Sequence, residues 1–200
     1  GYLAWLDDIL GIRDTANYSI KDLDYELKLF DSPLDLQKAI VEKNELNNKS
    51  RIVAGYCWDW VSKKDKSKFD IVFPEHGFAM RWNLDTDGAL WIQAKDSVSE
   101  IGCIHTCQGL EVDYVGVIIG MDLIYRNHDL ITDPSARART DKSLAGYKKE
   151  RKVDPFVADS KADELIRNTY RTLLTRGMKG CYVYFQDSAT AEYFKSILPK

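Results

Sequence analysis

Three short segments of the chain are apolar, rich in β-branched and aromatic residues, and unbroken by polar alternation. They read RIVAGYC at 51–57, YVGVII at 114–119 and CYVYF at 181–185. Runs of this kind are typical of strands that are covered on both faces, as in a parallel sheet. Segments with helical features separate them, so the repeating unit is strand, helix, strand. The sequence therefore predicts an α/β fold with a mostly parallel sheet flanked by helices.

Start and stop signals place further elements earlier in the chain. Ser32 can cap a helix and Pro33 fits its first turn, so a helix is expected from there to the Asn47, Asn48 pair. The stretch YLAWLDDIL, followed by Gly11, predicts a first helix with a glycine stop. YELKLF at 25–30 predicts a strand.

A last long helix is expected from Lys161, where apolar residues recur at helical spacing, to Gly177, which should end it. On this helix Arg167 and Arg171 are expected to face solvent. Arg176 lies roughly 70° from the middle of the apolar stripe, an unusual direction for a guanidinium. It could complement the helix dipole and reach into solvent, or it could be presented to a cleft to stabilise a transferring phosphoryl group.

Two inserts are expected between these elements. The region 69–95 contains FDIVF, FAMRW and ALWIQ separated by turn signals, which predicts a small antiparallel β flap. DLIYRNHDLITD at 122–133 predicts a hairpin, and the polar, basic segment 134–160 is expected to be partly mobile. Because 200 residues suffice for one sizeable core, we expect a single domain spanning 1–200.

Positive charge is concentrated in one stretch. Between Ser135 and Lys152 the sequence has seven basic residues against Asp141 and Glu150, although the whole chain has a net charge of −3. Such a run could contact phosphates, or it could be the solvated face of a helix. The sequence leaves both explanations open.

Cysteine usage and hydropathy favour a cytoplasmic protein. The four cysteines lie in or beside apolar runs without a CxxC spacing, so we expect reduced thiols; they are Cys57, Cys103, Cys107 and Cys181. No apolar run approaches the roughly 20 residues that span a bilayer, and the acidic N-terminal segment is unlike a signal peptide. Because position 1 is not methionine, we expect this sequence to be part of a longer protein.

One segment places several hydrogen-bonding side chains between two apolar ones. In GCIHTCQGLEVDYVGVII at 102–119, a glycine and four polar residues fall within seven positions; they are His105, Thr106, Gln108, Gly109 and Glu111. Ligands of open α/β sheets bind at the carboxyl ends of the strands, and we expect the segment to lie at such an end. A glycine allows close approach of a phosphate or backbone, which fits a nucleotide or nucleic acid. The alternative is a polar turn whose side chains bond the local backbone.

The same segments carry a resemblance to a known family. IHTCQGLEVDYVGVIIG resembles motif V and YRTLLTRGMKGCYVY resembles motif VI of superfamily 1 helicases, and with RIVAGYCWDW they are similar to the Schlafen-like DNA/RNA helicase domain family. The motifs occur in the expected order and each runs into a strand. The resemblance covers essentially the whole chain. It implies a RecA-like, P-loop NTPase-type fold, and a role as the second RecA-like domain of an ATP-dependent helicase or translocase.

The resemblance also implies roles for individual residues. Arg176 would be the catalytic arginine finger. The positions implied to contact ATP are Gln108, Gly109, Glu111 and Thr172. His105 and Thr106 would contact the nucleic-acid backbone. The implied cofactor is ATP with Mg²⁺, held mainly by the N-terminal RecA-like domain of the same protein, and the implied partners are that domain and DNA or RNA, in single-stranded form, with no membrane.

The sequence departs from the helicase pattern in several places. It contains no GxxxxGK[ST] segment and no evident acidic Walker B strand end, so this chain alone is not expected to hydrolyse ATP. The arginine of motif IV is expected upstream of Gly1. Motif VI more usually has an aromatic residue where Arg171 stands and alanine where Gly177 stands. A competing function is therefore a non-catalytic module that keeps the helicase fold and binds nucleic acid or protein.

Two other groups of side chains have alternative explanations. Trp58 and Trp60 flank the end of a predicted strand and could stack on unpaired bases, or simply pack in the core. Cys103, His105 and Cys107 could share one face of an extended segment, but no fourth ligand is evident, and core thiols explain the cysteines better than a metal site.

Overall fold

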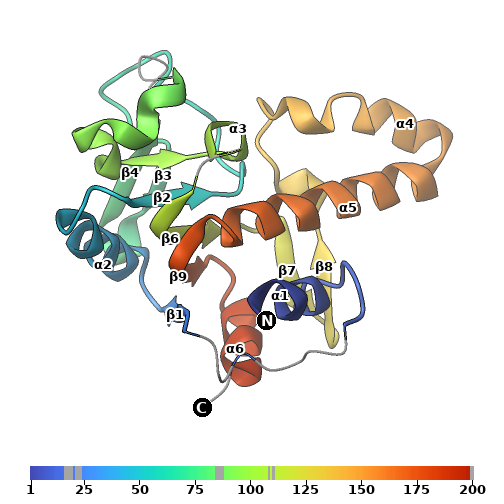
Figure 1. The fold of residues 1–200 in the computed structure, drawn as a ribbon. Coiled ribbons are helices and arrows are strands. Elements are labelled where there is room, and N and C mark those ends of the chain that lie inside the picture. The colour runs from blue at the N-terminus through green and yellow to red at the C-terminus, as the bar shows by residue number, and fades with distance from the viewer. Residues whose placement is uncertain (16–19, 21–23, 84–87, 108, 110, 199–200) are drawn as a thin grey trace.

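The computed structural model describes residues 1–15, 20, 24–83, 88–107, 109 and 111–198, and within them the dominant feature is a seven-stranded sheet (Figure 1). Its strands are β1 (Glu26–Phe30), β2 (Ser50–Ala54), β3 (Ile71–Phe73), β4 (Phe78–Trp82), β5 (Glu100–Gly102), β6 (Val112–Ile119) and β9 (Gly177–Phe185). Their order is β1-β9-β6-β2-β5-β4-β3, and every neighbouring pair is parallel except β3 and β4. The predicted α/β class with a mostly parallel sheet is confirmed.

Helices cover both faces of this sheet. They are α1 (Tyr2–Ile9), α2 (Pro33–Glu45), α3 (Ile104–Cys107), α4 (Tyr147–Val153), α5 (Pro155–Leu174) and α6 (Ser188–Ile197). Short 3-10 helices join them: η1 (Pro74–His76), η2 (Gly88–Gln93), η3 (Lys95–Ser99), η4 (Pro134–Ala136) and η5 (Lys142–Leu144). Within the described residues, no helix is both long and apolar enough to cross a membrane.

Each face of the sheet has its own core because the side chains of a strand alternate between faces. Val115 and Val117 of β6 pack with α1 and α5, whereas Ile118 packs with α2. Gly116 lies under α2, and a Cβ there would come within 2.8 Å of the Ile40 and Leu36 side chains. The glycine in the predicted strand YVGVII therefore allows α2 to lie close to the sheet.

The predicted β flap is only partly present. β3 and β4 are antiparallel as expected, but β4 also pairs with β5, so the two strands extend the main sheet. The third expected strand, ALWIQ, is the 3-10 helix η2. Trp91 in this helix is 1% exposed and its Nε1 donates to Glu100 at 2.9 Å. The prediction was wrong there because an aromatic, apolar pentapeptide packs equally well as a buried 3-10 turn.

The helix expected from Lys161 is longer than predicted at one end and shorter at the other. α5 begins at Pro155, capped by Asp154, and ends at Leu174. Gly177 does not end the helix, because it is the first residue of β9. A Cβ on Gly177 would lie 2.0 Å from the carbonyl oxygen of Gly180, so glycine is required there by a close backbone approach.

The expectation that Arg167 and Arg171 face solvent was wrong. Arg171 donates to the buried carboxylate of Asp7 in α1. The Arg167 guanidinium donates to the carbonyl oxygens of Leu10 and Leu130, each at 2.6 Å, and its side chain is only 14% exposed. Helical periodicity showed the stripe that meets the sheet, but not that α1 and a hairpin lie beside α5 and contact its flank.

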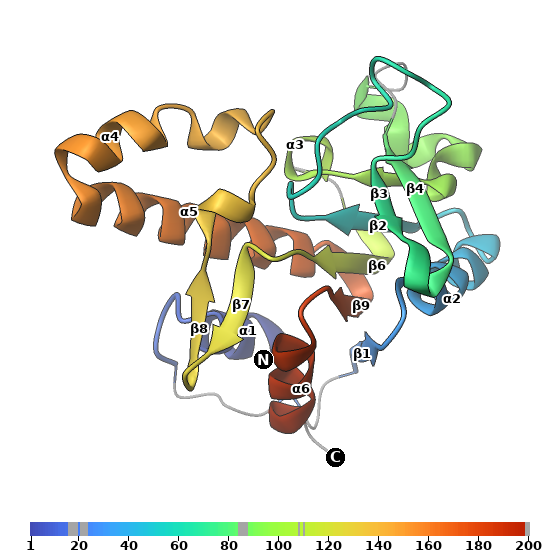
Figure 2. The ribbon, with the colours of Figure 1, turned by 180° about the vertical axis from the view of Figure 1, so that it is seen from behind.

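That hairpin is the one predicted at 122–133. β7 (Leu123–Arg126) and β8 (Asp129–Thr132) are antiparallel, and Asn127 and His128 form the turn with positive φ angles of 52° and 66°. The basic segment 134–160 forms η4, η5, α4 and the first turn of α5. α4 and the beginning of α5 project from the sheet as a two-helix arm (Figures 1 and 2).

Asp187 joins the hairpin to α6. Its carboxylate caps α6 by accepting from the backbone N of Thr190 at 2.9 Å, and it accepts two hydrogen bonds from the Arg126 guanidinium at 2.6 and 2.8 Å. Hydrogen bonds from Arg126 and Thr190 lower the pKa of Asp187 to about 2, against the opposing effect of burial.

We expect the contribution of Asp187 to stability to depend on pH. Because its folded pKa is below the unfolded value, the contribution is complete above about pH 4 and is lost as the pH falls towards 2. Asp187→Asn should lower the free energy of unfolding by about 2 kcal/mol at neutral pH, and this difference should shrink between about pH 4 and pH 2. Urea unfolding over this range measures it, with Asp35→Asn on the exposed face of α2 as the control. A difference that does not change with pH would contradict the assignment.

Candidate nucleotide and nucleic-acid site

The segment before β6 and the segment before β9, which the sequence singled out, meet at the end of the sheet where these two strands begin (the amino-terminal edge). The backbone N of Val112, at the start of β6, donates to the carbonyl oxygen of Arg176 at 3.0 Å, and Val112 pairs with Gly177 at the start of β9. Glu111 and Arg176 each precede these strand starts by one residue and are therefore neighbours. Gly109, with a φ of 80°, is exposed, and a Cβ there would have no heavy atom within 4 Å. Space is therefore open around Gly109 itself.

Arg176 is half-buried and lies against the end of α5. Its Nε donates to the carbonyl oxygen of Thr172 at 2.9 Å. The same side chain lines a small apolar space with Cys107 of α3. Burial raises the pKa of the Cys107 thiol, and the positive charge of Arg176 opposes that rise. The structure thus brings Arg176 close to Thr172 and to α3.

A groove of about 480 Å³ runs between α3 and α5. It is lined by Ile104, His105, Ser143, Lys161, Glu164, Leu165, Asn168, Thr169 and Thr172. His105, which was assigned to nucleic acid, and Thr172, which was assigned to ATP, lie in this one groove. The imidazole of His105 is exposed in it.

The position of the polar segment relative to the sheet differs from the prediction. β5 ends at Gly102, which is level with Val53, the next-to-last residue of β2, and α3 follows. Because β5 and β6 run in the same direction, the chain must then return to the edge where β6 begins. His105 and Thr106 therefore follow a carboxyl end of a strand, whereas Gly109 and Glu111 lie at the opposite, amino-terminal edge.

The remaining predicted residues are placed as follows. The Thr106 hydroxyl donates to Oδ1 of Asn83 at 2.9 Å, so one of its hydrogen bonds is made inside the protein. Gln108 lies outside the described residues. Trp58 packs edge-on against Phe73 with ring centroids 5.9 Å apart, and neither Trp58 nor Trp60 lines the groove between α3 and α5.

A buried charge network at the other edge of the sheet was missed. Arg137 lies between the carboxylates of Asp122, just beyond β6, and Asp141, at 3.0 and 2.6 Å, and all three side chains are at most 2% exposed. The hydroxyl of Tyr170 in α5 donates to Asp122 and accepts from the backbone N of Gly120 at 3.0 Å. In the sequence Arg137 is one of seven basic residues, and the Asp four residues later was the available signal.

Arg51 is a second buried cation that sequence reasoning missed. It is 1% exposed, and its acceptors are hydroxyl, amide and carbonyl oxygens of the segments around η2, η3 and the end of α2. Burial lowers the pKa of Arg51 to about 10. It fixes η2 and η3 beside β2, which positions Trp91 against the apolar space that Arg176 lines.

The His, Cys, Asp and Glu side chains of the described residues do not form a metal centre. Among the described residues, no group of three or more His, Cys, Asp and Glu side chains is placed to hold a metal ion. The groups at this end of the sheet whose chemistry suits an anionic ligand are the guanidinium of Arg176 and the open backbone at Gly109.

The sheet and its loops define an α/β protein with a polar segment and an arginine converging at one edge. Comparison with known sequences assigns it to a family: the chain belongs to the Schlafen group 3, DNA/RNA helicase domain family, whose model matches residues 1–187. This membership indicates a helicase-related role. The uncharacterized protein YPL245W of Saccharomyces cerevisiae is 29% identical over 185 residues, which is 91% of this chain and 38% of that protein. The chain thus spans less than half of this relative. No solved structure matches the chain.

Proposed function

We propose that the chain is the second RecA-like domain of an ATP-driven motor that acts on DNA or RNA. In this proposal it supplies Arg176 to ATP and Mg²⁺ that are held mainly by a first RecA-like domain of the same protein. The observation that carries the proposal is the hydrogen-bonded pairing of the strand starts at Val112 and Gly177, which makes Glu111 and Arg176 neighbours at the end of the sheet where β6 and β9 begin.

The chemistry required of Arg176 is electrostatic. Bound ATP supplies the phosphoanhydride whose γ-phosphoryl group is transferred to water, and negative charge on that group must be stabilised. Nε of Arg176 now donates to a helix-end carbonyl, and Thr172 and Thr175 provide polar groups around it. In the proposed state this guanidinium donates to a phosphate, and a hydrogen bond to a charged acceptor is stronger than one to a neutral carbonyl.

The groove between α3 and α5 supports a link between nucleotide and nucleic acid. α3 touches the apolar space lined by Arg176 and also carries His105 into the groove. Movement of α3 on nucleotide binding would therefore change the position of His105. In this way α3 could strengthen or weaken the contact of His105 with a nucleic-acid strand as the two domains close and open.

The test of the motor function is ATP turnover by the intact protein, measured with single-stranded DNA or RNA present, compared with that of Arg176→Ala. A large loss of turnover in the variant supports the proposal. Turnover that is unchanged contradicts the arginine-finger role. An intact protein that binds nucleic acid without any turnover would instead indicate a non-catalytic binding module that keeps the helicase fold.

A second expectation concerns His105. Replacing His105 with leucine, which cannot donate a hydrogen bond, should weaken binding of a single-stranded oligonucleotide by about ten-fold, because one hydrogen bond to a charged phosphate contributes roughly 1.5 kcal/mol. Fluorescence anisotropy measures this. His128→Asn is the control, since His128 is an exposed histidine on the β7–β8 turn and asparagine tolerates its positive φ. Equal affinities for the two variants would exclude His105 from the contact.

A further inference from the structure

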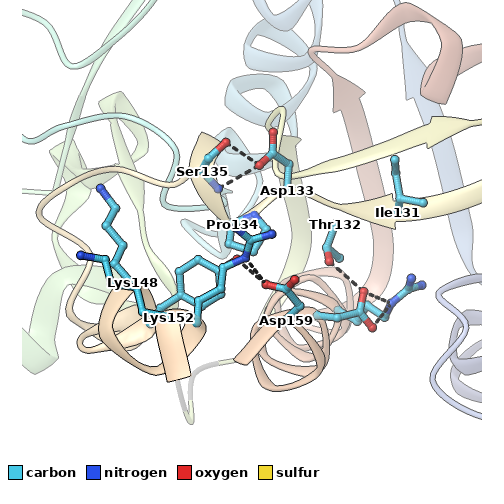
Figure 3. A pocket seen from close by; sticks show the side chains of 12 residues that line it. Ile131, Thr132, Asp133, Pro134, Ser135, Lys148, Lys152 and Asp159 are labelled. Atoms are coloured by element: carbon cyan, nitrogen blue, oxygen red, sulfur yellow. Dashed lines mark hydrogen bonds and ion pairs between the residues drawn. The ribbon is translucent and has the colours of Figure 1, made fainter. Parts of the chain in front are cut away.

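The two-helix arm has a large open cavity at its base. This cavity, of about 800 Å³, lies between α4, α5, β8 and η4 (Figure 3). Acidic side chains in it already have partners: Asp159 accepts from Tyr147 and from Arg151, and Asp163 pairs with Arg167. Asp133 accepts from the hydroxyl and backbone N of Ser135.

Two lysines that line the same cavity, unlike these acidic side chains, have no pairing partner in the described part of the chain. Lys148 and Lys152 are exposed, are one helical turn apart on α4, and have no acidic partner among the described residues. Glu150, by contrast, pairs with Lys161 and faces α5. α4 therefore pairs with α5 through Glu150 and Arg151. At the wall of the cavity it leaves Lys148 and Lys152 without an acidic partner within the ranges that the structure describes. Figure 3 shows Lys148 and Lys152 together on the α4 side of the cavity.

The tip of the arm is apolar and exposed. Val153 is 87%, Phe156 83% and Val157 38% exposed. The turn that holds them is well built, because Asp154 caps α5 through the backbone N of Val157 at 3.1 Å and Pro155 occupies the first turn. An aromatic ring is thus held in solvent at the tip of the arm, four residues after Lys152.

We propose that the arm is a second nucleic-acid contact, in which Lys148 and Lys152 bind the phosphates of a single strand and Phe156 stacks on a base. Cations that follow a backbone together with an exposed ring are the combination that binds unpaired strands without sequence preference. A protein partner with an acidic surface would use the charge, but it would not require an aromatic ring at position 156. The proposal shares its ligand with the proposed motor but does not need ATP.

The lysines and the ring should leave different signatures in the binding of a fluorescent single-stranded oligonucleotide to the intact protein. Lys148→Gln with Lys152→Gln should lower affinity at low salt by about ten-fold and reduce the slope of log affinity against log salt by roughly 1.4, the value for two lost phosphate contacts on a single strand. Lys38→Gln with Lys195→Gln, on α2 and α6, is the matched control and should change neither quantity. Melting temperatures equal to wild type confirm that the variants fold.

Phe156 should affect affinity but not the salt slope. Phe156→Ala should weaken binding by about ten-fold, because stacking of one base contributes roughly 1–3 kcal/mol. Phe156→Trp should keep the affinity of wild type, whereas Phe156→Leu should bind as weakly as Phe156→Ala. Leucine that restores binding would show that the tip makes an apolar contact to protein rather than to a base, and would overturn the stacking assignment.

The arm proposal and the motor proposal fail separately. If wild type binds single strands and the arm variants keep its affinity and salt slope, the arm is not a contact, whatever Arg176 does to ATP turnover. If wild type binds no single strand even at low salt, the arm proposal is also overturned. Turnover that is indifferent to Arg176 would contradict the motor alone.

Discussion

Arg176→Ala is expected to lower ATP turnover by the intact protein about a thousand-fold, because an arginine that stabilises charge on the γ-phosphoryl group contributes 10³–10⁵ in kcat. The loss should appear in kcat, with the KM for ATP changed by no more than about three-fold, since the interaction is made mainly in the transition state. Arg176→Lys should retain only part of the ATP turnover rate, because lysine cannot make the bidentate hydrogen bonds of a guanidinium.

The control for this comparison is Arg81→Ala. Arg81 is on β4, near the edge of the sheet that β3 closes, and donates to the carbonyl oxygen of Lys68 at 2.8 Å. Its replacement should leave turnover within about two-fold of wild type. If both variants lose activity equally, the effect of Arg176 is on folding or domain contact and not on the phosphoryl group.

Arg137→Met is expected to have the largest effect on stability. It would leave Asp122 and Asp141 buried with no cation between them, and breaking a buried pair in this way costs about 3–5 kcal/mol. The hydrogen bond from Ser143 and the charge of Arg137 lower the pKa of Asp141 against the opposing effect of burial. Methionine fills much of the space, so the loss reports the charge network and not a cavity.

Thermal and urea unfolding of Arg137→Met and Arg139→Met measure this effect. Both arginines are in the same basic stretch, but the Arg139 side chain is 91% exposed and lies 3.6 Å from Asp59 at the surface. Arg137→Met should melt roughly 10 °C below wild type, and Arg139→Met within about 2 °C of it. Equal melting temperatures for the two variants would show that the buried network does not stabilise the fold.

Much of the sheet could be predicted because its central strands are buried on both faces. β2, β6 and β9 are the three apolar runs of the sequence, and burial of both faces leaves a clear composition. η2 could not be separated from a strand, since its Trp91 and its apolar neighbours satisfy either form. The cover over Arg167 and Arg171 was also missed, because contacts between α5 and residues about 160 positions away leave no local pattern.

Motif resemblance supplied the residues of the candidate site, but it did not supply their positions relative to the sheet. Motif resemblance implied that Gly109, Glu111 and Arg176 share a site, and this stays a prediction; the pairing of Val112 with Gly177 makes Glu111 and Arg176 neighbours. Their place at the amino-terminal edge did not follow from the sequence, because the length of β5 was not evident. Arg51 was missed because a single arginine carries no sign of burial. Arg137 was missed because the basic residues around it obscured the signal from Asp141.

The length of α5 has a mechanical consequence. One helix of 20 residues runs from the turn at the tip of the arm to the residue preceding Thr175, and after Pro155 its sequence contains neither proline nor glycine that would let it bend. A tilt of about 10° at the Thr175 end would carry the far end through about 5 Å, given a rise of 1.5 Å per residue. A small tilt of α5 beside Arg176 would thus displace Phe156 by a distance close to the spacing of one nucleotide.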